Sequence, residues 1–492
     1  MQKQLTSPKK RKILVLSGGT ATNSLIDTCF NQYANPNCPN SAKITYILPV
    51  SDNGGSTSEI LRVIGGPAIG DIRSRIIRLI DETKEPFLVN FLSYRLPTDS
   101  TTAKLEWNSI VDGTHELWNT KTTNISLKEV CRSFLCYVHM ELLKRSSFKR
   151  GNSSTRNFNF SNGCVGNLFL TGCRLMLGSL NAAIELMVRL CKIDQEFVEI
   201  LPCINTNHTH HIAALLENGQ LIIGQSQISH PVSNSGILNN STLSTSAQQI
   251  NNDDDDDEEE EEEEDYANPT YIHPALKMSQ LNFTKDIWHS NSSGTNTSVH
   301  KNELLPCPIK KIFYINPYGE IIHPISNPSC ISSINNSDCI IYSIGSVMTS
   351  LLPILILSNI AESILNDDGN KRKKILLVNG SYDRETVQFN NNNSSTIPTT
   401  KNVNEYIEMI VTSVYDAYYY KHPKNRTQGD GVKNEIWNKV ITDVIYLENG
   451  EILIDDLDLT KNRKIKCHKI NGVNPGIYDG AVLYKTLRTI LE

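Results

Sequence analysis

Short apolar stretches alternate with longer amphipathic stretches along most of the chain. Near the amino end, the apolar stretch Lys12–Leu16 precedes a glycine turn, which is followed by Ser24–Gln32 with helical spacing and then by the apolar stretch Lys43–Val50. Strand-like stretches are short and bounded by turn residues, whereas amphipathic helices repeat with a period of about 3.6 residues. This order predicts a β-α-β unit.

The same alternation continues toward the carboxyl end. Further strands are predicted at Ile200–Cys203, His211–Leu215, Leu221–Gly224, Lys311–Ile315, Cys339–Ser343, Lys374–Val378 and Lys439–Tyr446. Further helices are predicted at Arg73–Asp81, Leu127–Lys144, Asn167–Ile193, Ile360–Asn366 and Asn404–Tyr419. Strands that alternate with helices favour a largely parallel sheet with helices on both faces. The sequence therefore predicts an α/β fold, with one hairpin across Glu217-Asn218-Gly219.

One segment, 229–302, interrupts the pattern. It is rich in Asn, Ser and Thr and contains thirteen consecutive acidic residues, Asp253 to Asp265. A segment with so few apolar residues cannot offset the entropy of ordering. We therefore expect a first part of the folded domain at 1–228, a mostly disordered acidic insertion at 229–302, and a second part of the domain at 303–492. The length of the chain is also compatible with two or three domains.

The acidic run conceals the charge of the rest of the chain. The whole chain has 47 basic and 53 acidic residues, a formal net charge of −6, whereas 47 basic against 40 acidic residues outside the run gives +7. A mildly basic surface suits a small anionic ligand, but it lacks the clustered Lys and Arg of a protein that binds duplex nucleic acid. We therefore expect no nucleic acid partner. The acidic insertion is a candidate for binding a protein partner.

Cysteine usage and the amino end favour the cytoplasm. Twelve cysteines occur without a C-x-x-C pair, which is typical of reduced thiols rather than a zinc ribbon or a dithiol redox motif. The basic start is followed by an apolar stretch too short for the core of a signal peptide. The segment Cys339–Leu357 has the length of a membrane span, but Gly345, Ser346 and Pro353 interrupt it. We expect a buried strand that turns into a buried helix, and no membrane association.

Three glycine-containing turns follow predicted strands, and such loops gather at the ligand-binding edge of a parallel sheet. The first contains Gly18, Gly19 and Thr20. Glycines permit close approach of the backbone, and a following helix offers unpaired N–H groups to an anion. The turn is neither a Walker A loop nor a G-x-G-x-x-G fingerprint. Either phosphate binding or a plain tight turn accounts for it.

The second turn is denser in polar residues. Asp52 follows the strand that ends near Val50, and Asn53, Gly54, Gly55 and Ser56 come next. A carboxylate beside a glycine-rich loop can hold Mg²⁺ against the phosphates of a substrate, because this ion takes one or two carboxylates and completes its shell with phosphate and water oxygens.

A helix that begins near Ile72 is preceded by a second glycine-rich stretch, Gly65 to Gly70. Asp71 either contacts the ligand or caps this helix, which is the commoner role for Asp at such a position. Arg73 is best placed to face a phosphate, whereas Arg75 and Arg78 are interpreted as solvated.

Two further loops are candidates. Gly345 and Ser346 follow the most apolar strand and precede a predicted helix, an arrangement that can bind an anion through backbone N–H groups and a hydroxyl. Gly166 and Asn167 open another predicted helix, where Asn167 either caps the helix or contacts the ligand, and capping is the commoner role. The histidine group His208 to His211 has no acidic or cysteine partner at a recognisable spacing, which disfavours a metal site there.

Taken in order, these segments resemble the signatures of the CofD/YvcK-like family. The resemblance is carried by KILVLSGGTATNSL, ITYILPVSDNGGSTSEILRVIGGPAIGDIRSRIIRL, FSNGCVGNLFLTGCRL, ENGQLIIGQSQI and SDCIIYSIGSVMTSLLPILI, and it spans the chain apart from the insertion. The chain is most similar to an uncharacterised fungal branch, as shown by FLSYRLP, HELW and FYINPYGE. The resemblance implies a Rossmann-like fold.

The family has two characterised arms. CofD is a 2-phospho-L-lactate transferase that, with Mg²⁺, moves a phospholactyl group from a guanosine diphospho donor to a hydroxyl acceptor and releases GMP. YvcK is a regulator that binds a UDP-sugar. The resemblance implies catalytic roles for Asp52 and Asp71, with Asp52 as the metal ligand. It implies nucleotide or phosphate binding by Gly18, Gly19, Thr20, Asn53, Gly54, Gly55, Ser56, Gly70, Arg73, Gly166, Asn167, Gly345 and Ser346.

Three positions depart from the family pattern. Asn53 stands where a second Asp is usual, which weakens a metal site of two carboxylates; Ala21 replaces a Gly and Ile344 a Pro. Two hypotheses follow: a Mg²⁺-dependent transferase that uses a nucleoside diphosphate donor, and a non-catalytic nucleotide-sugar sensor that acts through partners. Homo-oligomerisation is compatible with both.

Overall fold

The fold was described from a computed structural model of the chain. The structure describes residues 10–35, 38, 40–51, 54–119, 124–146, 157–229, 237–238, 305, 307–367, 372–383, 385, 387–389, 398–400, 402–423 and 434–492. The predicted acidic insertion lies outside these residues, apart from Ser229 and the short strand β6 (Ile237–Leu238). The predicted ligands Asp52 and Asn53 also lie outside them.

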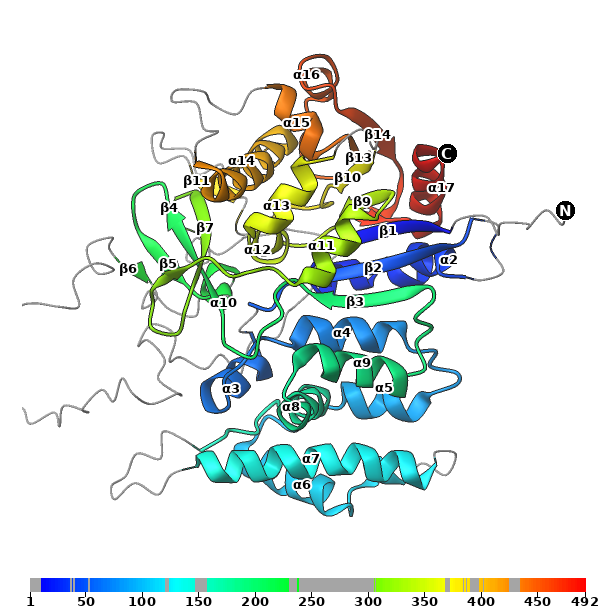
Figure 1. The fold of residues 1–492 in the computed structure, drawn as a ribbon, viewed down its shortest axis with the longest axis vertical. Coiled ribbons are helices and arrows are strands. Elements are labelled where there is room, and N and C mark those ends of the chain that lie inside the picture. Colours follow the sequence, from blue (N-terminus) through cyan, green and yellow to red (C-terminus); the bar gives the residue numbers. More distant parts are fainter. Residues whose placement is uncertain are drawn as a thin grey trace, which may run out of the picture.

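Within the described residues, seven parallel strands form the central sheet (Figure 1). Their order is β14-β13-β10-β9-β1-β2-β3. The bounds are β1 (Arg11–Leu16), β2 (Ala42–Leu48), β3 (Val198–Pro202), β9 (Cys339–Tyr342), β10 (Lys373–Leu377), β13 (Asp443–Leu447) and β14 (Lys466–Ile470). The central strands are almost wholly apolar, because helices or the rest of the core cover both faces. The predicted α/β fold with a largely parallel sheet is confirmed.

The strand order contains a reversal between β1 and β9. From β1 the chain builds outward through β2 to β3, and later returns to place β9 on the other side of β1. From β9 it builds in the opposite direction through β10 and β13 to β14. Both predicted parts of the folded domain, 1–228 and 303–492, therefore contribute strands to one sheet.

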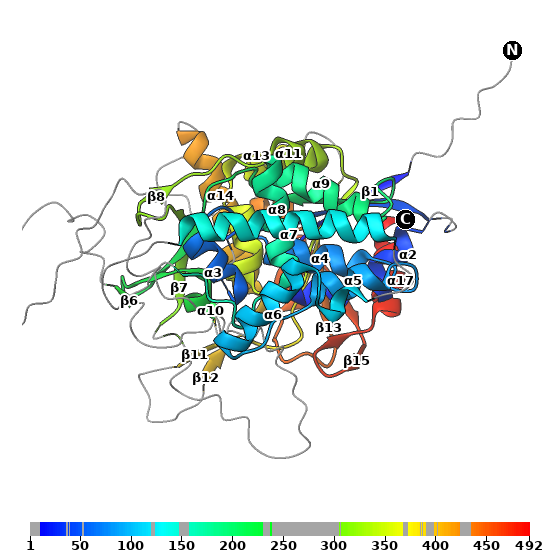
Figure 2. The same cartoon turned by 90° about the horizontal axis from the view of Figure 1, so that it is seen from below.

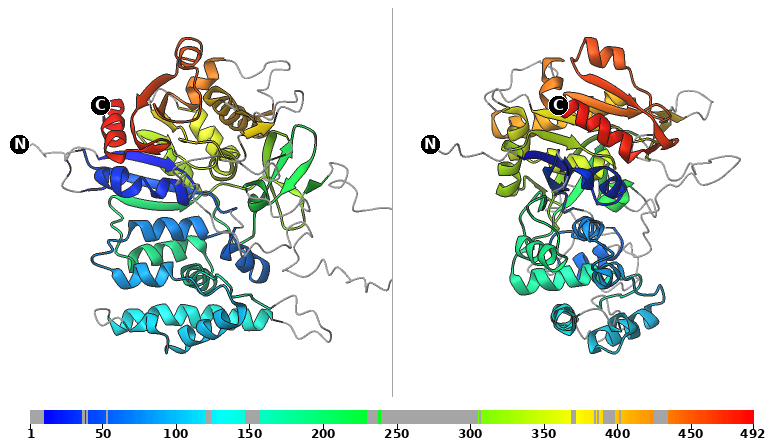
Figure 3. Two further views of the ribbon diagram at one scale, coloured as in Figure 1. Left: turned by 180° about the vertical axis from the view of Figure 1, so that it is seen from behind. Right: turned by 90° about the vertical axis from the view of Figure 1, so that its right-hand side faces the viewer.

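Helices cover both faces of this sheet. The helix α17 (Gly480–Leu491) packs against the π-helical turn η1 (Ile26–Phe30), while α11 (Pro328–Asn335) and α13 (Ser358–Leu365) lie on the other face (Figure 3). Two further helices, α14 (Val403–Lys421) and α15 (Asn434–Val440), pack against each other beside α13.

A layer of helices lies beyond the edge strand β3. It is inserted between β2 and β3 in the chain, and α7 runs across its outer side (Figure 2). The layer consists of α3 (Ser56–Val63), α4 (Gly70–Leu79), α5 (Pro86–Ser93), α6 (Ser100–Asp112), η2 (Glu116–Trp118), α7 (Ile125–Arg145), α8 (Val165–Leu177) and α9 (Leu180–Leu190).

A second sheet is antiparallel and has the order β6-β5-β4-β7-β8. The predicted hairpin is confirmed as β4 (His211–Leu216) and β5 (Leu221–Ile223), and β4 also pairs with β7 (Ile309–Ile315). The remaining elements are α1 (Thr20–Asn23), α2 (Asn31–Tyr33), α10 (Gln225–Ser229), β8 (Ile321–Ile322), η7 (Val347–Leu351), α12 (Leu352–Leu355), β11 (Val387–Phe389), β12 (Pro398–Thr400), α16 (Asp456–Lys461), β15 (Gly472–Asn474) and β16 (Ile477–Tyr478).

Three predicted elements differ from the structure. The single helix predicted at Asn167–Ile193 is two helices, α8 and α9, because Gly178 ends α8 in the left-handed conformation with φ of 69°. The strand predicted from Lys439 begins only at Asp443, since Lys439 belongs to α15. The helix predicted at Ser24–Gln32 is a series of short turns that includes η1. Buried helix ends and buried strands are equally apolar, so periodicity alone did not separate them.

The apolar segment Cys339–Leu357 was predicted to be a buried strand followed by a buried helix. The structure confirms this arrangement as β9, η7 and α12, all close to the core. In the part of the chain that the structure describes, no single helix is long and apolar enough to cross a membrane. The apolar helical segments at 347–355 and 358–365 meet at an angle of 78°.

Candidate functional site

The reversal between β1 and β9 marks the edge at which ligands bind in open α/β sheets, outside the carboxyl ends of the strands. The loop of Gly18 and Gly19 follows β1, and the loop of Gly345 and Ser346 follows β9. The two loops are joined by Thr22, whose hydroxyl donates to Ser343 Oγ at 2.9 Å and to the Ile344 carbonyl at 3.0 Å. Two predicted loops therefore meet at one point.

Gly18 and Gly19 are buried and pack against polar side chains from other elements. A Cβ atom at Gly19 would lie 2.5 Å from Asp71 Oδ1, and a Cβ atom at Gly18 would overlap the Ser350 hydroxyl. The glycines thus allow the Asp71 carboxylate and the Ser350 hydroxyl to approach the backbone. Thr20 begins α1 and is partly exposed.

Asp71 is a buried carboxylate, 3% exposed, in the first turn of α4. The helix begins at Gly70 rather than at Ile72, its N-cap residue is Ile69, and no side chain caps it. The capping interpretation of Asp71 is therefore wrong. The helix begins one residue before Asp71, so Asp71 lies inside the first turn and not at the N-cap position. The contact with the first glycine loop remains.

Side chains from three helices meet in one hydrogen-bonded group. Arg73 Nε of α4 donates to Asn167 Oδ1 of α8 at 3.0 Å, and Asn167 Nδ2 donates to Ser56 Oγ of α3 at 3.0 Å. The space beside Gly70 is taken by Thr57, since a Cβ atom there would lie 3.0 Å from Thr57 Oγ1. The structure therefore brings together residues that the sequence placed in separate motifs, more than ninety positions apart in the case of Arg73 and Asn167.

The capping interpretation of Asn167 is also wrong. The N-cap residue of α8 is Cys164, without a side-chain cap, and Asn167 lies inside the helix. Its neighbour Gly166 packs against α5, where an added Cβ atom would overlap the Leu92 carbonyl oxygen. Close helix packing explains this glycine, and its predicted contact with a ligand stays a prediction.

The loop after β2 leads into α3. Gly55 is the N-cap residue of α3 and has φ of 56°, a conformation that glycine adopts readily. Gly54 precedes it, and Ser56 is buried in the first turn. The start of α3 therefore lies beside the hydrogen-bonded group of Arg73 and Asn167.

The loop after β9 is held by two side chains that the sequence did not single out. Asn379, which follows β10, accepts from Gly345 N at 2.9 Å and donates to the Gly345 carbonyl at 2.8 Å. Ser346 donates to the buried Glu385 carboxylate and accepts from Thr349 N at 2.9 Å as the N-cap residue of η7. The Ser346 hydroxyl thus contacts a carboxylate in this structure, at the place predicted to hold an anion.

Arg75 and Arg78 were interpreted as solvated, and for Arg75 this is wrong. Arg75 is 0% exposed, and its guanidinium donates to Ser17 Oγ at 3.1 Å and to the Gly18 carbonyl at 2.8 Å. Burial lowers its pKa to about 10, which leaves the group charged at neutral pH. Arg78 is half-exposed and forms an ion pair with Asp27. Nothing in the sequence pattern distinguishes Arg75 from Arg78 in this respect.

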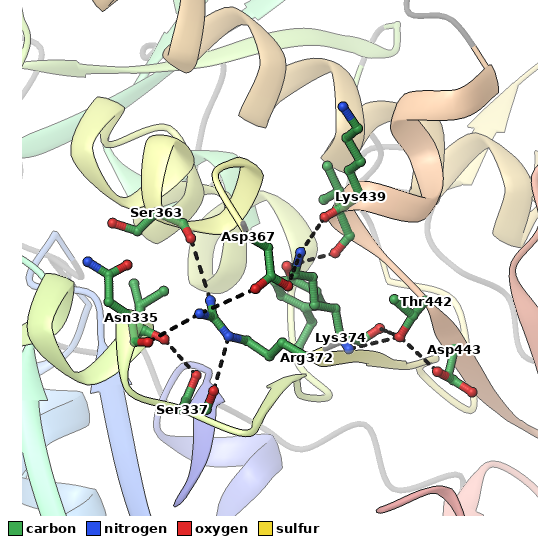
Figure 4. A network of polar contacts seen from close by, with 12 residues as sticks. Asn335, Ser337, Ser363, Asp367, Arg372, Lys374, Lys439, Thr442 and Asp443 are labelled. Carbon is green, nitrogen blue, oxygen red and sulfur yellow. Dashed lines mark hydrogen bonds and ion pairs between the residues drawn. The ribbon is translucent and has the colours of Figure 1, made fainter. Parts of the chain in front are cut away.

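The opposite edge of the sheet carries a separate polar network (Figure 4). Arg372 donates to the backbone carbonyls of Ser337 and Asn335 at 3.1 and 3.3 Å and forms an ion pair with Asp367. Lys374 also forms an ion pair with Asp367, at 3.2 Å. A cavity of about 440 Å³ adjoins this network at the amino ends of β9 and β10. Ligands of open α/β sheets bind at the carboxyl ends, so the glycine loops are the candidate site.

Among the residues that the structure describes, no group of three or more His, Cys, Asp or Glu side chains is arranged to hold a metal ion. His211 in β4 is buried, and burial lowers its pKa to about 4. The predicted metal ligand Asp52 lies outside the described residues, so the metal site stays a prediction.

Comparison with known proteins identifies the family. The family model described as 2-phospho-L-lactate transferase CofD matches residues 13–435. The uncharacterized protein YNL011C of Saccharomyces cerevisiae is 47% identical over 469 residues, which cover 93% of this chain and 95% of the yeast protein. Two crystal structures of protein BH3568 from Bacillus halodurans, one described as a member of the UPF0052 family, share the fold.

The first of these structures has a TM-score of 0.53 at 15% identity and covers 98% of this chain and 100% of its own. The second has a TM-score of 0.51 at 15% identity and covers 99% of this chain and 100% of its own. These values support the α/β fold alone, whereas the family model spans most of the sequence. The chain therefore belongs to the CofD family.

Proposed function

We propose that this protein is a Mg²⁺-dependent transferase of the 2-phospho-L-lactate transferase type. It binds the diphosphate of a nucleotide donor at the loops after β1, β2 and β9, and it transfers a phosphoryl-linked group to a hydroxyl acceptor. The observation that carries the proposal is the buried Asp71 carboxylate, which lies against Gly19 at the reversal of the strand order. The Asp71 carboxylate thus lies beside the loops at which a diphosphate would bind, and carboxylate oxygens are ligands that Mg²⁺ prefers.

The residues present fit a bound Mg²⁺. The Asp71 carboxylate and the Ser350 hydroxyl both lie beside Gly18, and they offer the oxygen donors that this ion prefers. Asp71, together with Asp52, would hold the ion against the donor's phosphates. When bound, Mg²⁺ would neutralise part of the diphosphate charge.

This chain's own residues would bind the donor, orient it toward the acceptor and stabilise the charge on its diphosphate. The acceptor hydroxyl oxygen forms a new bond to phosphorus and loses its proton. The bond between that phosphorus and the bridging oxygen of the diphosphate breaks, and the nucleoside monophosphate leaves with the bridging oxygen. Arg73, fixed by Asn167, places a positive charge at the start of α4, and the helix starts of α3 and α4 add N–H donors. No covalent intermediate on the protein is required.

A ligand screen followed by product analysis tests the proposal. Purified protein is heated with GDP, GMP, UDP-sugars or inorganic pyrophosphate, with and without Mg²⁺, and the change in melting temperature is recorded. We expect stabilisation by a nucleoside diphosphate that depends on Mg²⁺, followed by release of the monophosphate when donor and acceptor are supplied together. Binding of a UDP-sugar without turnover would instead support the nucleotide-sugar sensor.

Asp71→Asn tests the observation that carries the proposal. Because this change keeps the size of the side chain but removes its charge, we expect at least a tenfold loss of Mg²⁺-dependent nucleotide affinity with a melting temperature close to wild type. Asp27→Asn is the matched control, since it removes a half-exposed acidic charge that pairs with Arg78 of the same helix, α4. Equal affinities of wild type and Asp71→Asn for nucleotide and Mg²⁺, measured by calorimetry, would contradict the role of Asp71.

A further inference from the structure

Three arginines are buried among the residues that the structure describes: Arg75, Arg174 and Arg372. Two of them lie beside a carboxylate, since Arg75 interacts with Asp71 and Arg372 forms an ion pair with Asp367. Arg174 is 6% exposed and forms no ion pair with a described residue. A buried charge is costly unless an opposite charge compensates for it, and Arg174 is the exception among the three.

The only charged group that acts on Arg174 among the described residues is a second cation. This group is Arg145, at the end of α7. Arg145 pairs with Glu141 at 3.2 Å, and the same carboxylate pairs with Lys144 at 2.8 Å. Burial, and then the repulsion from Arg145, lower the pKa of Arg174 to about 10, so the group stays charged at neutral pH. The one carboxylate in this group is therefore already shared by two other cations.

The guanidinium of Arg174 uses only part of its hydrogen-bonding capacity. Its Nη2 atom donates to the Gly65 carbonyl at 2.9 Å, and this is its one hydrogen bond to a described residue. The other N–H groups are not sealed in the core, because the buried and unpartnered atoms of the described residues include two nitrogens of Arg75 but none of Arg174. A guanidinium carries five N–H donors in a planar fork that matches two oxygens of a carboxylate or phosphate. Arg174 therefore has donors left for an oxyanion that approaches from solvent.

Three segments meet at the guanidinium of Arg174. The side chain comes from α8, Gly65 and Gly66 belong to the turn between α3 and α4, and Thr209 precedes β4. A Cβ atom at Gly66 would lie 2.5 Å from the guanidinium carbon, and Gly66 has φ of 101°, so this glycine lets the guanidinium lie against the backbone. Gly66 N donates to Thr209 Oγ1 at 2.8 Å. Gly65 and Thr209 are partly exposed, so solvent reaches this place.

Arg174 lies on the same side of α8 as Asn167. The seven residues between these positions make about two helical turns, which separate them by about 10 Å along the helix axis. Asn167 belongs to the hydrogen-bonded group beside the glycine loops, whereas Arg174 contacts the turn between α3 and α4. The place beside Arg174 is therefore close to the candidate site but separate from it.

We propose that Arg174 anchors a second oxyanion site, at the turn between α3 and α4, which binds a carboxylate or phosphate group of a small ligand. The two groups share the chemistry that a guanidinium recognises, because each offers two oxygens to parallel N–H donors. The bound oxyanion supplies the negative charge that Arg174 lacks, and Arg145 adds attraction from α7. The inference goes beyond the proposed function, because it requires neither Mg²⁺ nor a nucleotide.

Potassium phosphate and potassium succinate are the probes, and potassium chloride at equal ionic strength is the reference for general salt effects. The melting temperature of the full chain, without Mg²⁺, is recorded against the concentration of each anion for wild type, Arg174→Gln, Arg174→Lys and Arg189→Gln. Gln removes the charge but keeps a donor for the Gly65 carbonyl, whereas Lys keeps the charge. Arg189→Gln is the matched control, since it removes an exposed arginine that pairs with Glu185 on the neighbouring helix α9.

We expect phosphate or succinate to raise the melting temperature of wild type by at least about 2 °C above the chloride reference, and the rise should saturate. Arg174→Gln should lose most of this rise, whereas Arg174→Lys and Arg189→Gln should keep more than about half of it. A response to phosphate alone identifies a phosphate group as the ligand, and a response to succinate alone identifies a carboxylate. Either result supports the site when it depends on Arg174.

The absence of a saturable response in wild type would overturn the inference, as would a cooperatively melting Arg174→Gln that responds like wild type. An Arg174→Lys protein that responds no more than a cooperatively melting Arg174→Gln would also overturn it, because the charge would then not hold the anion. If Arg174→Gln does not melt cooperatively, Arg174→Lys decides: a retained response supports the inference, and a lost response overturns it.

Arg73→Gln separates this site from the glycine loops, because Arg73 belongs to the hydrogen-bonded group of Asn167. A response that Arg73→Gln loses and Arg174→Gln keeps would place the oxyanion at the glycine loops and overturn the inference. A phosphate response that depends on Arg174, in a protein that binds no nucleotide with Mg²⁺, would overturn only the proposed function. Nucleotide binding with Mg²⁺, without a response to phosphate or succinate, would overturn only the second site.

Discussion

Asp71 and Asn167 are polar residues near predicted helix starts, and the sequence alone does not decide their roles. Both were weighed between capping and ligand contact, and capping is the commoner role. In the structure α4 begins at Gly70 and α8 at Val165, so both side chains lie inside the first turn. The capping roles failed because the helix boundary, which pattern alone does not fix, decides them, and the contact of both residues with a ligand stays a prediction.

The burial of Arg75 could not be predicted from the sequence, for a related reason. Three arginines in GDIRSR and IIRL occur on one amphipathic helix, and nothing in their spacing separates the buried one from the half-exposed one. Burial of Arg75 depends on Tyr46 from β2 and on the loop after β1, which are brought together only by the sheet. The same holds for Asn379 and Glu385, which are far from Gly345 and Ser346 in sequence.

At the residue scale, His211 should make stability depend on pH. Burial lowers its pKa to about 4, against about 6.5 in an unfolded chain. The unfolded state therefore binds the proton more tightly, and stability is lost as the pH falls from about 6.5 toward 4. At about 1.4 kcal/mol per pH unit, we expect this residue to account for a loss of about 2 kcal/mol between pH 7 and pH 5.

Urea unfolding at the two pH values measures this effect. His211→Leu should show a loss of stability smaller than wild type by about that amount, because it lacks the titrating group. His208→Leu is the matched control, since His208 is exposed in the same segment, and it should behave like wild type. The same loss in His211→Leu as in wild type would contradict the assignment.

At the scale of elements, the helices of the layer beyond β3 were predicted as periodic segments, but their packing was not. Leu127–Lys144 agrees closely with α7, whereas the break between α8 and α9 at Gly178 was missed. A helical stretch with internal glycines is compatible with a break, a close crossing or a ligand contact. The structure assigns a close crossing to Gly172 and the break to Gly178.

Gly172→Ala tests this close crossing. An added Cβ atom would overlap the Phe134 carbonyl oxygen of α7, so α7 and α8 must separate. We expect a loss of about 1–3 kcal/mol in the free energy of unfolding, even though Ala favours a helix more than Gly does. Met176→Ala on the same helix is the control, because Met176 is 55% exposed and should change stability by less than about 0.5 kcal/mol. Chemical denaturation measures the free energy of unfolding. A higher value for Gly172→Ala than for wild type would show that α7 and α8 accommodate the added methyl group, and it would contradict the prediction.

At the scale of the whole molecule, the alternation of strands and helices predicted the sheet, but it did not predict the strand order. The strand β9 lies beside β1 because the chain returns to the centre of the sheet. The hydrophobic pattern of short apolar stretches does not indicate which strands are neighbours. The family resemblance supplied the expectation of a Rossmann-like fold. The topology then places the candidate site at the reversal of the strand order.

The acidic run gives the last prediction, which concerns the charge of the molecule. Deleting 241–265 leaves Ser229, which donates to Glu385 at 2.7 Å, and leaves β6, which pairs with β5. The deleted residues contain thirteen acidic residues and no Lys or Arg, so 47 basic against 40 acidic residues changes the formal net charge from −6 to +7. Such a polar tract has little apolar area to bury, and we expect calorimetry to show a melting temperature within about 5 °C of wild type.

The same deletion should increase the rate at which an anionic ligand associates. A net positive molecule attracts pyrophosphate over a distance set by the ionic strength, so the increase should be clear at low salt and small near physiological salt, where the screening length is about 8 Å. Replacing the thirteen acidic residues by Ser and Asn separates charge from length and should give the same rate as the deletion. An unchanged rate at low salt in both variants, measured by stopped flow, would show that the run does not act on the site through its charge.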